Sequence, residues 1–172
     1  MIREAIDALV GGHSLTMDEA AASMNEIMKG DATPAQFGAY VTALRLKGET
    51  VQEIAGMARV MREKALHVSV SGVLVDTAGT GGDRSGSFNI STTAALVAAG
   101  AGVKVAKHGN RAMSGATGSA DVLEALGVNI DLSPESVQQC IEEVGFGFMF
   151  AQRYHPSMRF AAGPRREIGI RN

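Results

Sequence analysis

The sequence of 172 residues predicts an α/β protein, in which an all-helical N-terminal domain precedes the first part of a mainly parallel sheet domain. Residues 1–68 contain repeated helix-capping patterns, which predict a helical bundle. Residues 69–172 alternate short apolar runs with helical segments, which is typical of parallel sheets. Glycine-rich or polar clusters follow the apolar runs, where ligands of such sheets bind. We therefore expect two domains, 1–68 and 69–172.

Four helices are expected in the first domain. Apolar residues at helical spacing predict a helix near residues 2–10, ended by two glycines. Capping-box patterns then begin at Thr16, Thr33 and Thr50, so further helices are expected over about 17–30, 34–48 and 51–66. Several apolar positions on these helices fit either the bundle core or an adaptable surface against another chain: Met24, Ile27, Met28, Met57, Val60 and Met61.

The sheet domain begins with the apolar run 73–75, which leads into the glycine-dense sequence GTGGD at 79–83 and a helix after Asn89. Glycines allow close backbone approach to a ligand, and the start of the next helix attracts anions, so this loop favours phosphate. Asp83 suits a ribose hydroxyl or a metal ion. The alternative is a glycine turn that only caps a helix. Side chains expected to add donors at the helix start are Asn89, Ser91, Thr92 and Thr93.

A second polar cluster, expected to form a loop over residues 107–111, follows the apolar run 103–106, which is expected to form a strand. Here Lys107 and Arg111 supply positive charge, Asn110 an amide and His108 a titratable ring. Both polar clusters should lie at the carboxyl ends of adjacent parallel strands and converge on one ligand. The elements expected further along are a helix over 120–126, a brief strand over 128–130, a helix from Ser133 to Glu143, and a buried strand over 145–151.

Composition limits the function classes. The formal net charge of −2 gives no sign of a nucleic-acid partner. Cys140 is the single cysteine, which excludes an internal disulfide and fits a reducing compartment. No apolar stretch of about 18 residues is present, and the charged N-terminus does not suit a secretion signal. We therefore expect a cytoplasmic protein without a membrane or nucleic-acid partner.

The motifs DTAGTGGD, FNIST and KHGNRAMSGATGSADVLEALG together resemble the anthranilate phosphoribosyltransferases, and the similarity continues through FAQRYHP and RREIGIR. This resemblance implies a type-III phosphoribosyltransferase-like fold in the nucleoside phosphorylase and phosphoribosyltransferase superfamily. It implies transfer of a 5-phosphoribosyl group from phosphoribosyl pyrophosphate to anthranilate, with Mg²⁺ as cofactor. It also implies a homodimer formed through the helical domain.

The resemblance assigns roles to individual residues. It implies that Ser91 contacts Mg²⁺ and that anthranilate is bound by Gly79, Asn110, His155 and Arg165. The fork of Arg165 suits a carboxylate. No nucleophilic residue is required, and His108 is the first candidate for a general base. The implied contacts to phosphoribosyl pyrophosphate are Gly79, Gly82, Asp83, Ser87, Asn89, Ile90, Ser91, Thr92, Lys107, His108, Gly109, Asn110, Arg111, Ala112, Met113, Ser114, Gly115 and Ser119.

Two departures from the family pattern stand out. Ser87 occupies a position where relatives usually have threonine, which keeps the hydroxyl. Family members also continue for about as many residues again, so we expect a truncated form that is inactive alone. The alternatives are a pyrimidine nucleoside phosphorylase-like enzyme and a non-catalytic nucleic-acid-binding paralogue. The GTGGD motif and Arg165 argue against the first, and the near-neutral charge argues against the second.

Overall fold

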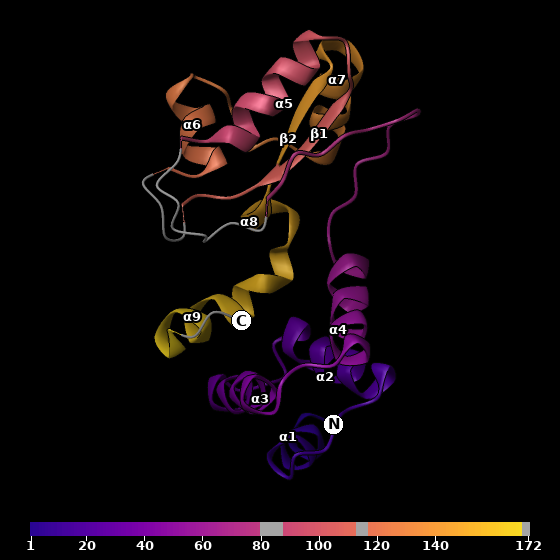
Figure 1. The fold of residues 1–172 in the computed structure, drawn as a ribbon, viewed down its shortest axis with the longest axis vertical. Helices are drawn as coiled ribbons and strands as arrows, with labels where there is room; N and C mark the ends of the chain where they lie inside the picture. The colour runs from indigo at the N-terminus through magenta and orange to yellow at the C-terminus, as the bar shows by residue number, and fades with distance from the viewer. Residues whose placement is uncertain (80–87, 113–116, 170–172) are drawn as a thin grey trace. The chain divides into compact units, whose positions relative to one another are not determined.

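The computed structural model describes residues 1–79, 88–112 and 117–169, and these form two compact units (Figure 1). The helical unit comprises Met1–Ala65 together with the segment from His155 onward, and the sheet unit comprises Leu66–Tyr154. The sequence-based boundary between residues 68 and 69 stays a prediction. What the structure adds is that residues 155–169 pack with the N-terminal helices.

Capping boxes begin three helices of the helical unit, as predicted. The side chains of Thr16, Thr33 and Thr50 each accept a hydrogen bond from the backbone N–H three residues later, and the acidic or amide side chain there accepts one from the backbone N–H of the threonine. Each box satisfies two backbone donors that the first helical turn leaves unpaired. The helices of this unit are α1 (Ile2–Val10), α2 (Met17–Lys29), α3 (Pro34–Lys47), α4 (Val51–Glu63), η1 (Pro156–Met158) and α9 (Arg159–Ile168).

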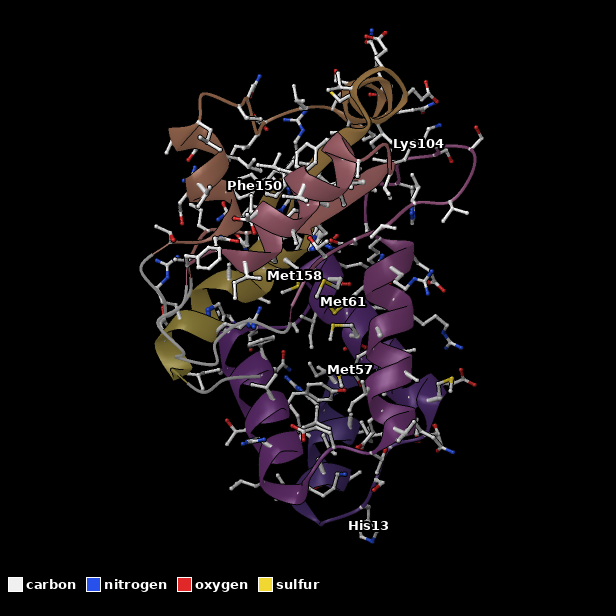
Figure 2. All side chains as sticks on the ribbon, turned by 45° about the horizontal axis from the view of Figure 1, so that its top comes forward. His13, Met57, Met61, Lys104, Phe150 and Met158 are labelled. Carbon is white, nitrogen blue, oxygen red and sulfur yellow. The ribbon has the colours of Figure 1, made fainter. Side chains whose placement is uncertain are left out.

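The core of the helical unit lies where α2 packs on α4 and where α3 packs on both α1 and α9 (Figure 1). Gly56 permits the close approach of α4 to α2, because a Cβ there would lie 2.1 Å from the carbonyl oxygen of Met17. Of the two interpretations of the methionine-rich positions, the bundle core is confirmed. Met57 and Met61 lie on α4 against this core (Figure 2), as does Met24, while Ile27, Met28 and Val60 are buried within it.

A buried carboxylate joins three segments of the helical unit. Glu53 is fully buried and accepts hydrogen bonds from the backbone N–H of Leu15 at 2.9 Å and of Thr50 at 2.7 Å. It also pairs with the Lys47 ammonium, at 3.0 Å. Burial alone would raise the pKa of Glu53, but the N–H donors of Thr50 and Leu15 and the Lys47 ammonium outweigh it and hold that pKa below its ordinary value.

The sheet unit is built on two parallel strands, as predicted. β1 (Val105–Gly109) pairs with β2 (Phe146–Phe150), with Val105 opposite Phe146. On its other edge β1 forms a parallel bridge to Val75. The Val75 N–H donates to the Lys104 carbonyl, and the Val75 carbonyl accepts from the Ala106 N–H. The helices of this unit are α5 (Ile90–Gly100), α6 (Ser119–Ala125), α7 (Pro134–Val144) and α8 (Ala151–Tyr154).

Strand alternation divides the sheet into two faces. Phe148 packs with Leu123 of α6 on one face, and its partner across the ladder, Lys107, shares that face. On the opposite face Ala106 packs in a cluster with Val137 and Ile141 of α7. Lys107 and His108 are consecutive strand residues, so their side chains leave the sheet on opposite faces.

Three sequence-based expectations about the sheet are wrong. Residues 107–109 belong to β1 and are not part of a loop, since all three pair with β2. The run 73–75 contributes only the bridge at Val75, because Val73 is 84 % exposed and Gly72 has a positive φ of 94°. Residues 128–130 form no strand, because the Asn129 side chain instead accepts from the Asp131 N–H. Within the described ranges no helix is both long and apolar enough to cross a membrane.

Candidate functional site

The start of α5 is held by side chains of the first polar cluster. Asn89 caps the helix, since its Oδ1 accepts from the Thr92 N–H at 3.1 Å and from the Ser91 hydroxyl at 3.2 Å. The expectation that Asn89 is a donor here is therefore incomplete, because its amide oxygen acts as an acceptor inside the helix start. Ile90 begins the helix and is exposed. The remaining candidates of this cluster, Gly82, Asp83 and Ser87, lie outside the described residues.

Lys107 is a buried cation near this helix start. Its side chain is only 1 % exposed, and Nζ donates to the Thr77 hydroxyl at 3.3 Å. The Thr77 hydroxyl in turn donates to the backbone carbonyl of Ser91 at 2.7 Å. Burial lowers the pKa of Lys107, and the nearby carboxylate of Asp76 opposes that shift. The ammonium of β1 is thus connected to the first turn of α5 through one hydroxyl group.

Asp76 links the glycine loop to β1. Its Oδ1 accepts from the Ala78 N–H at 3.0 Å, and its Oδ2 accepts from the His108 N–H at 3.4 Å. Burial lowers the pKa of His108, Asp76 opposes the shift, and Lys107 adds to it. The imidazole therefore favours its neutral form at neutral pH, in which one ring nitrogen can accept a proton. A role for His108 as general base stays a prediction.

Sequence reasoning did not assign roles to Asp76 and Thr77. The available signal was their position, directly after the apolar run 73–75 and before Gly79. Polar residues at that position face the ligand edge of a parallel sheet. By contrast, the partners of the two residues on α5 and β1 lie 14 to 32 residues away along the chain, and they become visible only in the fold.

Arg111 takes part in a charged cluster with α6. Its guanidinium pairs with Asp121 at 3.2 Å, donates to Glu124 at 2.8 Å, and lies 5.6 Å from the ring centroid of Phe150. Both carboxylates raise the pKa of Arg111, Glu124 more than Asp121. Asp121 also accepts from the backbone N–H groups of Ala112 at 2.9 Å and Gly118 at 2.8 Å. A contact of Arg111 or Ala112 with phosphoribosyl pyrophosphate stays a prediction.

The Asn110 segment lies against the start of α6. The Asn110 carbonyl accepts from the Ala120 N–H at 3.2 Å, and the Asn110 side-chain oxygen accepts from the Arg111 N–H at 2.8 Å. Gly109 and Ser119 are neighbours, because a Cβ on Gly109 would lie 2.9 Å from the Ser119 Cβ. The structure thus brings these candidate residues together at the end of β1. Three further candidates, Met113, Ser114 and Gly115, lie outside the described residues.

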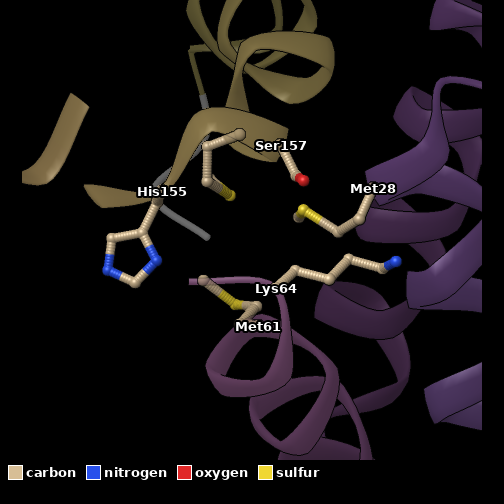
Figure 3. Close-up of a pocket in the computed structure, with 6 residues that line it drawn as sticks. Met28, Met61, Lys64, His155 and Ser157 are labelled. Atoms are coloured by element: carbon tan, nitrogen blue, oxygen red, sulfur yellow. The ribbon is translucent and has the colours of Figure 1, made fainter. Parts of the chain in front are cut away.

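Two candidate residues belong to the helical unit. His155 lines a pocket with the thioether side chains of Met28 and Met61 (Figure 3) and with Lys64, Ser157 and Met158. Arg165 lies on α9 and is half-buried, whereas its neighbour Arg166 is exposed. The remaining described candidates, Gly79 included, belong to the sheet unit.

A candidate metal contact is the Ser91 hydroxyl, at the first turn of α5. Among the residues that the structure describes, no group of three or more histidine, cysteine, aspartate or glutamate side chains could hold a metal ion. Mg²⁺ commonly keeps several waters and binds through one or two protein oxygens together with substrate phosphates. A single hydroxyl beside a phosphate-suited helix start is compatible with that mode.

Comparison with known families decides the relationship. The α/β domain of the glycosyl transferase family matches residues 71–172, and the helical bundle domain of the same family matches residues 3–65. The chain belongs to this glycosyl transferase family. Its two matched domains cover nearly the whole sequence, and the helical start and parallel sheet of the structure agree with their descriptions.

Relatives of the chain in this family include proteins named anthranilate phosphoribosyltransferase. The chain is 66 % identical over 170 residues to an anthranilate phosphoribosyltransferase of Chloroflexus aurantiacus and covers 50 % of that protein. It is 61 % identical over 171 residues to one from Dehalococcoides mccartyi, again covering 50 % of it. The chain therefore spans about half the length of the curated relatives that it matches.

Solved structures show the same relationship. The anthranilate phosphoribosyltransferase from Thermus thermophilus matches with a TM-score of 0.88 at 49 % identity, over 98 % of this chain and 51 % of that one. The enzyme from Saccharomyces cerevisiae, in complex with phosphoribosyl pyrophosphate and Mg, matches with a TM-score of 0.89 at 26 % identity, over 99 % of this chain and 52 % of that one. The predicted fold class is confirmed.

Proposed function

We propose that this chain supplies the phosphoribosyl pyrophosphate site of an anthranilate phosphoribosyltransferase. The observation that carries the proposal is the buried Lys107 ammonium, which Thr77 connects to the first turn of α5 at the ligand edge of the sheet. A helix N-terminus and a fixed cation together favour a phosphate group. The names of the relatives at 61 to 66 % identity support this choice of substrate.

In the proposed reaction the anthranilate nitrogen attacks C1 of the ribose. The C1–N bond forms as the C1–O bond to pyrophosphate breaks, and the nitrogen then loses a proton. An aromatic amine is neutral at pH 7, so the barrier lies mainly in the charge that develops on the leaving pyrophosphate. Lys107 and the positive end of the α5 helix dipole stabilise that charge. Neutral His108 is the candidate acceptor of the proton.

Anthranilate would be bound by its carboxylate and its amine. Arg165 is the proposed carboxylate partner, because its planar fork matches two carboxylate oxygens. Asn110, Gly79 and His155 are the other proposed contacts. The Ser91 hydroxyl is the proposed protein contact for Mg²⁺, which when bound would supply positive charge to offset the charge of the leaving group.

A homodimer through the helical unit is part of the proposal. A surface groove between α1 and α3 is lined by Leu9, Ala43 and Lys47, with the apolar side chains of Val10 and Leu46 beside them. Val10 is 74 % exposed and Leu46 is 83 % exposed, which leaves apolar area for a second copy to cover. A cytoplasmic location completes the proposal, since the single Cys140 suits a reducing compartment.

Calorimetric titration with phosphoribosyl pyrophosphate and Mg²⁺ tests the proposal. We expect the parent chain to bind and a Lys107→Met variant to bind at least about tenfold more weakly, since one charged hydrogen bond contributes roughly 1.5–3 kcal/mol. Lys104→Met is the matched control, because Lys104 precedes β1 and belongs to no candidate contact. Equal binding by Lys107→Met and the parent, or no binding by the folded parent, would contradict the proposal.

A further inference from the structure

We infer that Thr77 and Asp76 are positioning residues that fix the Lys107 ammonium relative to the start of α5; the inference rests on the proposed function. Neither residue is among the ligand contacts argued above. Both lie in the segment between the bridge residue Val75 and the glycine loop. Each makes a hydrogen bond to an element that carries a proposed ligand contact, α5 in one case and β1 in the other.

The proton arrangement around Thr77 follows from the chemistry of its two partners. A lysine ammonium has only donors, so the Thr77 oxygen must accept from Lys107. A backbone carbonyl has only acceptor capacity, so the single hydroxyl proton of Thr77 must point to Ser91. The hydroxyl therefore holds one orientation and ties the ammonium to a specific carbonyl of the first helical turn. A side chain without this hydroxyl could not make either bond.

Asp76 fixes the other side of the same junction. One carboxylate oxygen accepts from the Ala78 N–H and so shapes the turn that presents Thr77. The second oxygen accepts from the His108 N–H, which is the backbone group directly after Lys107. Its negative charge also favours the charged form of a lysine that burial otherwise disfavours. Asp76 thus holds both the turn that carries Thr77 and the strand that carries Lys107.

The physical consequence is a buried charge with a defined position. An ammonium that is only 1 % exposed cannot exchange its protein partners freely for water. Its distance from the α5 start is set by the Thr77 oxygen, with bonds of 3.3 Å on one side and 2.7 Å on the other. A phosphate bound at the helix start would meet the cation already in place, so little reorganisation would accompany binding.

The test compares Thr77→Val, which keeps the side-chain shape but removes the hydroxyl, with Thr77→Ser, which keeps the hydroxyl. Thr42→Val is the matched control, because Thr42 lies on α3 of the helical unit and belongs to no candidate contact. Asp76→Asn is a second perturbation that retains an acceptor but removes the charge. The first readout is the Lys107 Hε–Cε cross-peak at one fixed pH, assigned through Lys107→Met. The second is the calorimetric affinity for phosphoribosyl pyrophosphate with Mg²⁺.

We expect Thr77→Val to move the Lys107 cross-peak and to weaken binding about tenfold, the loss typical of one hydrogen bond to a charged group. Thr77→Ser should restore both, Asp76→Asn should move the cross-peak, and Thr42→Val should change neither. An unmoved cross-peak in Thr77→Val and Asp76→Asn, or failure of Thr77→Ser to restore the cross-peak, would overturn the inference. If the unsubstituted chain does not bind phosphoribosyl pyrophosphate, the proposed function fails, and the Lys107 cross-peaks alone then decide the positioning role.

Discussion

Replacing Glu53 by glutamine should strongly destabilise the helical unit. The substitution keeps the size of the side chain but removes its charge and converts one acceptor oxygen into a donor NH₂ group. In the structure one carboxylate oxygen accepts from Leu15, while the other accepts from Thr50 and from Lys47. In the better of its two amide orientations, glutamine would still place its NH₂ group against the Leu15 N–H.

The size of the effect follows from these contacts. A buried N–H that loses its acceptor costs about 1–3 kcal/mol. Removing one partner of a buried ion pair costs about 3–5 kcal/mol, and both Glu53, which is 0 % exposed, and Lys47, which is 9 % exposed, are buried enough for that range to apply. Because the two costs overlap, we expect a total loss of about 3–5 kcal/mol in the free energy of unfolding.

Urea unfolding followed by far-ultraviolet circular dichroism measures this loss, with the exposed Glu63→Gln on the same helix as control. Since the folded pKa of Glu53 is depressed, its stabilising effect is present above the unfolded value of about 4.3 and is lost as the pH falls through the folded pKa. The difference between parent and Glu53→Gln should therefore narrow below about pH 4. A loss under about 1 kcal/mol at pH 7 would refute the reasoning.

Three further perturbations probe other parts of the molecule. Gly147→Ala would place a Cβ 2.6 Å from Ile141 Cγ1, so we expect a loss of about 1–3 kcal/mol in thermal unfolding, and an unchanged melting temperature would contradict the tight packing of β2 on α7. Asp121→Ala should speed amide exchange at Ala112 and Gly118 roughly tenfold, because each loses a charged acceptor, and unchanged exchange would show that these bonds do not protect them. Leu46→Glu should shift the protein toward monomer in sedimentation velocity, and an unchanged sedimentation coefficient would place any dimer contact elsewhere.

Local hydrogen bonding explains which parts of the fold the sequence predicts well. The boxes that begin at Thr16, Thr33 and Thr50 involve residues three positions apart, and all three helix starts are confirmed. The two parallel strands follow from apolar runs, and their pairing is confirmed. The choice between core and surface for the methionine-rich positions needed the packing of α2 against α4, which periodicity alone does not specify.

Features that depend on contacts between residues far apart in the sequence were harder to predict. The polar residue type of Lys107 suggested a loop, but Lys107 is a buried strand residue whose ammonium donates to Thr77, 30 residues earlier. The roles of Asp76 and Thr77 likewise depend on bonds across the fold. Nothing in the sequence indicated that residues 155–169 pack with the N-terminal helices, since that depends on tertiary contacts such as those of Ala161.

The most direct test of the central claim is a chemical-shift map of the chain during titration with phosphoribosyl pyrophosphate and Mg²⁺. If the junction of β1 and α5 binds phosphoribosyl pyrophosphate, the largest chemical-shift changes among assigned backbone amides should fall on Ile90, Ser91 and Thr92, and on Lys107 and its neighbours. Saturable shifts confined to the helical unit, or the absence of shifts at millimolar donor in a folded chain, would contradict the claim that this junction is the donor site.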